Sequence, residues 1–203
     1  MHNKLNAIYD WAVEIFKDIA SPVIAGGAVR DSLMDKEPKD YDVFLMGHQY
    51  EDDIKDKVIE VLKPYEKIYG LEWHKSEPYL VTTIKVLDSE VQILVTPIRS
   101  IPELLNSFDW NVCLFAYGVH EGKLQVVQHA KIEDIGKDKF LKLNKLTYPL
   151  STLRRGYRFS ERFKMRLSSD DLEKIIAECH KHFTLHNNRE SGFPSMASQI
   201  DVS

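Results

Sequence analysis

Apolar residues recur three or four positions apart in several parts of the chain, as they do on one face of an amphipathic helix. The first such pattern covers residues 3–20, and a second begins at Ile54 and is ended by Pro64. After Pro149 the pattern is helical throughout, and Ser168-Ser169 has the residue type that caps the start of a final helix. The chain is therefore expected to begin and end with helices.

Short runs rich in β-branched residues lie between these helical patterns. Val23-Ile24-Ala25 is stopped by Gly26-Gly27, which is typical of a buried strand that enters a tight turn. The predicted strands are 23–25, 41–45, 80–86, 91–95, 112–117 and 124–127, with short helices at 28–34 and 100–108. The pattern predicts a mixed α/β (α+β) head over residues 1–147, a helical neck over 148–186 and a polar tail over 187–203, which we expect to be mobile.

Composition and charge narrow the class of protein. The chain has 203 residues, of which 43% are apolar and 29% charged, as in an ordinary folded domain. The net charge of −4 excludes a uniformly basic nucleic-acid coat but allows a local basic face. Two cysteines cannot form a disulfide framework, and no run approaches the roughly 18 apolar residues of a membrane span. We expect a soluble, cytoplasmic protein without a membrane partner.

The residues that suggest chemistry lie between Gly26 and Asp42. Asp40 and Asp42 are two apart on a predicted strand, so both carboxylates leave the same face, as a Mg²⁺ site for phosphoryl transfer requires. Gly26 and Gly27 allow the backbone to approach a triphosphate closely, and Arg30 adds a cationic fork. Either motif alone is common, but the two in this order are far more specific.

The run GGAVRDSLMDKEPKDYD, residues 26–42, resembles the signature of class II tRNA nucleotidyltransferases and bacterial poly(A) polymerases, in the polymerase-β-like nucleotidyltransferase superfamily. Fainter similarity continues through 109–117, 132–143 and 155–163. The resemblance implies a nucleotidyltransferase head followed by a helical neck. It also implies transfer of a nucleoside monophosphate from an NTP such as ATP to a hydroxyl, with two Mg²⁺ ions and release of pyrophosphate. The implied acceptor is an RNA or tRNA 3′ end.

The resemblance also assigns expected roles to individual residues. Asp40 and Asp42 match the metal ligands, and Gly27 and Arg30, beside Gly26, match the triphosphate contacts. Arg155 and Arg158 match two neck arginines that reach the bound nucleotide, and their i, i+3 spacing places them on one helix face.

The third carboxylate of the site has two candidates. The family's acid lies on the strand that begins near Glu90, and Gln92 and Leu94 on that face cannot replace it, which leaves Glu90 if the register slips. Asp109, at the head of the next strand, is the other candidate and the one we favour, against the simpler interpretation of Asp109 as a helix-end cap.

Two departures from the family pattern affect the expected substrate. The stretch Tyr148-Pro-Leu-Ser-Thr152 stands where the family has the Asp and Arg that read the incoming base. The sequence also ends near residue 203, whereas family enzymes continue into helical domains that hold the tRNA. A protein or small-molecule acceptor is therefore one alternative, and a non-catalytic nucleotide-binding regulatory module is another.

Overall fold

The computed structural model describes residues 3–48, 52–65, 67–69, 79–137 and 139–187. Nearly all of the predicted tail lies outside these residues. The helices are α1 (Asn3–Phe16), α2 (Gly27–Leu33), α3 (Asp52–Val61), α4 (Ile101–Ser107), α5 (Pro149–Phe163) and α6 (Ser169–Asn187). The strands are β1 (Pro22–Ala25), β2 (Asp40–Met46), β3 (Lys67–Tyr69), β4 (Tyr79–Val86), β5 (Ser89–Thr96), β6 (Phe115–His120), β7 (Lys123–Gln128), β8 (Phe140–Leu141) and β9 (Arg166–Leu167), with 3₁₀ turns at Asn111–Cys113 and Ile132–Asp134.

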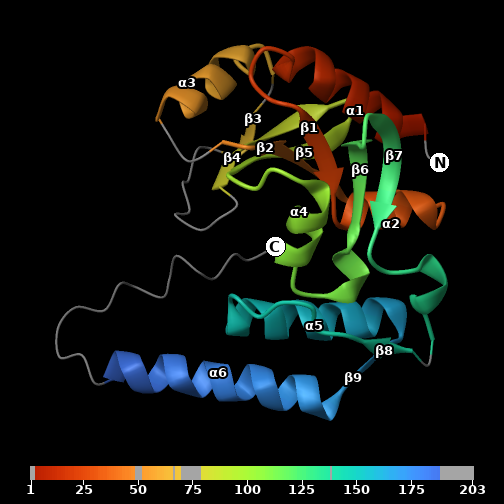
Figure 1. Cartoon of the computed structure of the whole chain (residues 1–203), viewed down its shortest axis with the longest axis vertical. Coiled ribbons are helices and arrows are strands. Elements are labelled where there is room, and N and C mark those ends of the chain that lie inside the picture. The colour runs from red at the N-terminus through yellow and green to blue at the C-terminus, as the bar shows by residue number, and fades with distance from the viewer. Residues whose placement is uncertain (1–2, 49–51, 66, 70–78, 138, 188–203) are drawn as a thin grey trace.

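In the described part of the chain, seven strands form one mixed sheet in the order β3-β4-β5-β2-β1-β6-β7. Strands β2 and β5 are parallel, and the other neighbours are antiparallel. Helices α1 and α3 cover one face of the sheet, and α4 lies against the other (Figure 1). The predicted mixed α/β fold is confirmed.

The side chains of β2 point alternately to the two faces of the sheet, and its two acids point to the face that α4 covers. Tyr41, Val43 and Leu45 are fully buried in the core beneath α1 and α3. Side chains at alternate positions leave a strand on opposite faces, so Asp40 and Asp42 share the α4 face with Phe44.

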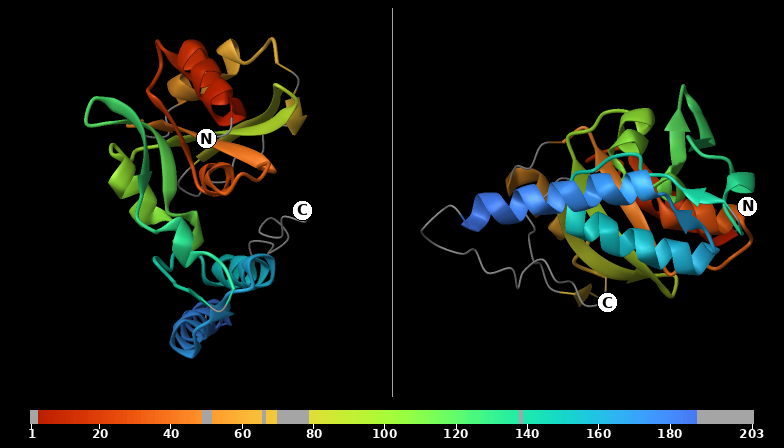
Figure 2. Two further views of the ribbon diagram at one scale, coloured as in Figure 1. Left: turned by 90° about the vertical axis from the view of Figure 1, so that its right-hand side faces the viewer. Right: turned by 90° about the horizontal axis from the view of Figure 1, so that it is seen from below.

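The helical neck packs directly on the head. Helices α5 and α6 run side by side below the sheet (Figure 2), and the short β8–β9 ribbon joins the two parts. Phe163, Met165 and Ile175 belong to the same buried cluster as the sheet residues, so one apolar core extends from head to neck.

Two predicted elements differ from the structure. The strand expected over 112–117 begins only at Phe115, because Cys113 N–H donates to Trp110 O (2.9 Å) and Leu114 N–H to Asn111 O (3.2 Å), which closes a 3₁₀ turn. The region after Pro149, expected to be helical throughout, contains β9, which pairs with β8. The predicted cap of α6 is present, since the Ser168 hydroxyl accepts the N–H of Asp171 at 3.1 Å.

In the part of the chain that the structure describes, no helix is both long and apolar enough to cross a lipid bilayer.

Candidate functional site

Three carboxylates meet where β1 ends and where β2 and β5 begin. Ala25, the last residue of β1, pairs with Asp42, and Asp40 stands directly opposite Glu90 on the parallel neighbour β5. Directly paired residues of adjacent strands project to the same face of a sheet. Asp40, Asp42 and Glu90 therefore form an acidic group at one edge of the α4 face.

The pKa of Asp42 reflects its closeness to the other two carboxylates of this group. Removal of water from around Asp42, together with the negative charges of Asp40 and Glu90, raises its pKa to about 7. A neighbouring cation would stabilise the ionised form of this carboxyl and so favour loss of its proton. The effect of Glu90 on Asp42 also shows that Glu90 belongs to the group without any slip of register.

Asp109, which we favoured as the third carboxylate, has a different partner. Its Oδ2 accepts hydrogen bonds from Arg155 Nε (2.7 Å) and lies 2.6 Å from Arg155 Nη2, a fork-like ion pair between the head and α5. The positive charge of Arg155 offsets the negative charge of Asp109, and the ion pair ties this carboxylate to α5. The geometry therefore favours Glu90 over Asp109 as the third acid.

The Gly26-Gly27 turn lies against the acidic group. Gly26 has φ +83°, which disfavours residues with a side chain, and its N–H donates to Phe115 O at 2.7 Å. A Cβ on Gly26 would lie 3.7 Å from Asp42 Oδ2, so the absence of a side chain leaves backbone beside that carboxylate. The turn predicted from the sequence is thus placed next to the predicted acids.

Arg30 is buried, with 1% of its surface exposed. Its Nε donates to Asp31 Oδ1 (2.8 Å), its Nη1 donates to Val112 O (3.0 Å), and its guanidinium lies 4.6 Å from the centre of the Phe163 ring. Its Nη2 is the guanidinium nitrogen nearest to the glycine turn, 3.3 Å from where a Cβ of Gly27 would stand. The arginine expected to hold a triphosphate thus holds α2, the 3₁₀ turn and α5 together.

Cys113 lies close to charged residues of both the head and the neck. Burial raises the pKa of its thiol to about 12, and the charges of Arg30, Asp109, Arg155 and Asp42 all act on it. A thiol with so high a pKa is a poor nucleophile. Asp42 of the head and Arg155 of α5 thus both lie within electrostatic range of Cys113.

Asp31 and Arg162 form a second ion pair between head and neck that the sequence did not single out. Arg162 Nη2 donates to Asp31 Oδ2 at 2.7 Å, and the Asp31 side chain is only 3% exposed. The available signal was the arginine stripe of α5, where residues 155, 158 and 162 are three and four apart. Arg158, between the two anchored arginines, is exposed and forms no ion pair with any described residue.

The first turn of α5 occupies the position where the resemblance to nucleotidyltransferases places the residues that read the base. Tyr148 is 44% exposed, whereas Thr152 is buried and its carbonyl accepts the indole N–H of Trp110 at 2.9 Å. Trp110 also packs on Gly156, where an added Cβ would lie 2.6 Å from the ring. The turn thus offers an exposed aromatic ring and no charged side chain for base recognition.

The donor set fits Mg²⁺. Carboxylate oxygens are its preferred protein ligands, and Mg²⁺ is commonly held by one or two carboxylates, with water and substrate phosphates completing the shell. Among the described residues, no three His, Cys, Asp or Glu side chains are gathered closely enough to hold an ion by themselves.

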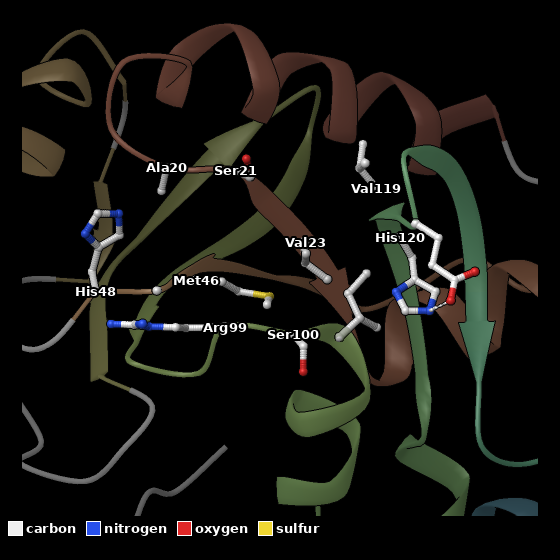
Figure 3. Close-up of a pocket in the computed structure, with 12 residues that line it drawn as sticks. Ala20, Ser21, Val23, Met46, His48, Arg99, Ser100, Val119 and His120 are labelled. Atoms are coloured by element: carbon white, nitrogen blue, oxygen red, sulfur yellow. Dashed lines mark ion pairs between the residues drawn. The ribbon is translucent and has the colours of Figure 1, made fainter.

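A separate hollow of about 470 Å³ lies at the opposite end of β1 and β2 (Figure 3). Its polar lining includes His48, Arg99 and His120, and its one carboxylate, Glu121, lies 4.0 Å from His120. This lining has no group of hard oxygen ligands and shares no residue with the acidic site.

Solved structures of similar fold include CCA-adding and tRNA-processing enzymes. The chain is similar to "The complex structure of CCA-adding enzyme with CTP" with a TM-score of 0.59 and 14% identity, over 90% of this chain and 43% of that one. It is similar to "tRNA-processing enzyme (apo form I)" with a TM-score of 0.57 and 18% identity, over 89% and 48%. For "Thermotoga maritima CCA-adding enzyme complexed with tRNA_CCA" the TM-score is 0.56 and the identity 14%, over 93% and 45%. The chain spans less than half the length of each, and the likeness establishes a nucleotidyltransferase-like fold.

A comparison with curated proteins gives no match. A family model described as "Gad2: Gabija anti-defense 2 family protein" matches residues 2–137, which include every residue of the acidic group and of the glycine turn. The chain therefore belongs to the Gabija anti-defense 2 family.

Proposed function

We propose that this protein is a Mg²⁺-dependent nucleotidyltransferase, which transfers a nucleoside monophosphate from an NTP to a hydroxyl of an RNA 3′ end and releases pyrophosphate. The observation that carries the proposal is the meeting of Asp40, Asp42 and Glu90 beside the backbone of Gly26. The nucleotidyltransferase-like fold supports it, and Asp40 and Asp42 lie in the sequence motif that the family resemblance assigns to metal binding.

Each residue has a distinct part in this proposal. Asp40, Asp42 and Glu90 would hold Mg²⁺, which when bound supplies a Lewis acid for the attacking hydroxyl and neutralises the departing pyrophosphate. Asp42 must lose its proton to act as a ligand, and a cation favours that loss.

The glycine turn and α5 would position the nucleotide. Gly26 and Gly27 leave backbone accessible next to the acids, and Arg158 supplies an exposed cation on the face of α5 that carries the two anchored arginines. Arg155 and Arg30 are positioning residues in this scheme, because the Asp109 pair and the buried contacts occupy most of their donors.

The family description adds a biological setting. It names an anti-defence role directed at Gabija. We propose that nucleotidyl transfer is the activity behind that role.

The test is a labelling experiment with all four α-³²P-labelled NTPs, Mg²⁺, a cell extract and added RNA, including tRNA. We expect label in RNA from the wild-type protein and none from Asp40→Asn/Asp42→Asn. The matched control is Asp10→Asn/Asp18→Asn, which removes two exposed acids from α1 and its following turn and should label as the wild type does. Undiminished labelling by the Asp40/Asp42 variant would refute the proposal. Label in a protein or small molecule would replace the RNA acceptor, and binding of NTP without any transfer would favour a regulatory nucleotide-binding module.

A further inference from the structure

Positive charge is concentrated in one part of the chain. Residues 131–166 contain eleven Lys or Arg and four Asp or Glu, a net charge of +7 in a chain whose net charge is −4. The segment comprises the connection from head to neck, β8, α5 and β9. So uneven a distribution creates a local field that attracts polyanions even though the whole protein is acidic.

Most of these cations are available at the surface. Arg155 and Arg162 are used in the ion pairs with Asp109 and Asp31. Eight others are exposed and form no ion pair with any residue that the structure describes: Lys131, Lys137, Lys139, Lys142, Lys145, Arg154, Arg158 and Lys164. We call these eight residues the basic surface.

Backbone contacts connect this surface to the candidate site. Lys145 N–H donates to Asp109 O (3.3 Å), and the Asp109 side chain holds Arg155. Lys142 and Asn111 exchange two hydrogen bonds of 3.0 Å, which tie the same segment to the head. From Lys139 to Lys145 the segment can span about 20 Å if extended. These hydrogen bonds hold the segment that carries Lys142 and Lys145 against Asp109 and Asn111 of the head.

Exposed aromatic rings lie among the cations. Phe140 is 46% exposed and stacks on Arg166, whose guanidinium is 4.9 Å from the ring centre. Tyr148 and Tyr157 are 44% and 55% exposed. Phe140 and Lys142 are both exposed, one on each side in sequence of the buried Leu141.

We propose that the basic surface binds a single-stranded nucleic acid and that this strand is the acceptor whose end reaches the acidic site. Cations that follow a backbone, combined with exposed rings on which bases stack, are the recurring design of sites for single strands. An acidic peptide would use the cations but has no flat bases for the rings. The inference rests on the proposed function for the role of the strand as acceptor, but not for its binding.

Binding is measured by fluorescence anisotropy with a labelled single-stranded RNA 20-mer in EDTA and without NTP, so that no transfer occurs. A DNA strand of the same sequence shows whether the 2′-hydroxyl contributes. Polyglutamate of equal charge serves as competitor and separates a nucleic-acid site from a general polyanion site.

The test variant is Lys139→Glu/Lys142→Glu, and the matched control is Lys57→Glu/Lys123→Glu, which changes the net charge equally at exposed positions of the head. We expect the test variant to bind RNA about tenfold more weakly or worse, and the plot of log affinity against log salt to lose about 1.4 units of slope. The control should bind as the wild type does. Phe140→Ala should also weaken binding, by about tenfold, whatever the base sequence.

Equal affinities of the test variant and the control would overturn the proposal, as would displacement of RNA by polyglutamate at an equal concentration of charge. Thermal melts of both variants show whether each is folded. Because binding is read without Mg²⁺ or NTP, intact binding with no transfer counts against the proposed function alone. Transfer to RNA with undiminished binding by the test variant counts against the basic surface alone.

Discussion

Asp42 differs from an ordinary surface carboxyl because the fold places it among other acids and partly removes it from water. Both effects disfavour its charged form and raise its pKa to about 7 from an ordinary value of 3.8. The metal-free protein therefore retains, near neutral pH, a proton that the unfolded chain has already released.

This difference predicts how stability varies with pH in the absence of metal. Between about pH 4 and pH 7 the folded state binds the Asp42 proton and the unfolded state does not, so the free energy of unfolding falls as pH rises through this window and levels off above about 7. Asp42→Asn removes the effect. The variant should be more stable than the wild type at pH 8, on the order of a few kcal/mol, with the difference vanishing near pH 4.

Urea denaturation of both proteins in EDTA at pH 4, 6 and 8 measures this difference. A stability difference that does not change with pH would show that Asp42 titrates as an exposed carboxyl does.

At the scale of elements, α5 fits the head through a contact that leaves no room for a side chain. Alanine in a helix interior is ordinarily more favourable than glycine. At Gly156, however, a Cβ would lie 2.6 Å from the buried Trp110 ring, so either the ring or the helix must move. Gly156→Ala should therefore destabilise the protein by about 1–3 kcal/mol.

A double-mutant cycle locates the cause of that loss. Trp110→Phe shortens the ring and should recover part of the stability of Gly156→Ala, although it loses the hydrogen bond to Thr152 O. Chemical denaturation of the two single variants and the double variant gives the coupling. Additive losses would mean that the ring and Gly156 do not interact.

The first turn of α5 predicts weak discrimination among NTPs. Hydrogen-bonding groups that read a base reject wrong partners strongly, whereas shape and stacking reject them by about 1–3 kcal/mol. Thr152 is buried and Tyr148 presents an exposed ring, on which any base can stack. Binding or transfer measured with ATP, CTP, GTP and UTP at equal concentrations should differ by no more than about 150-fold. A sharp preference for CTP and then ATP on tRNA ends would show that another residue reads the base.

For the whole molecule, the sequence predicts what depends on neighbours along the chain and fails where distant segments meet. The helix and strand patterns, the glycine turn and the same-face acids Asp40 and Asp42 are local, and the structure contains them. The choice between Glu90 and Asp109 depended on the pairing of β2 with β5 and on an ion pair between residues 46 apart, neither of which a local pattern encodes. The burial of Arg30 has the same origin, since its partners come from the 3₁₀ turn and α5.

The last prediction concerns the ion pair that joins head and neck. We expect substitution of Asp31 to reduce stability more than substitution of its partner Arg162. Asp31 is 3% exposed and accepts from Arg30 as well as from Arg162, so Asp31→Ala leaves the buried Arg30 guanidinium without its carboxylate. Loss of one partner of a buried pair costs about 3–5 kcal/mol. Arg162 is 45% exposed, and its loss leaves Asp31 paired with Arg30, so Arg162→Ala should cost about 1 kcal/mol or less. Thermal and urea denaturation of the two variants tests this order, and equal losses would mean that the Arg30–Asp31 contact does not hold the neck on the head.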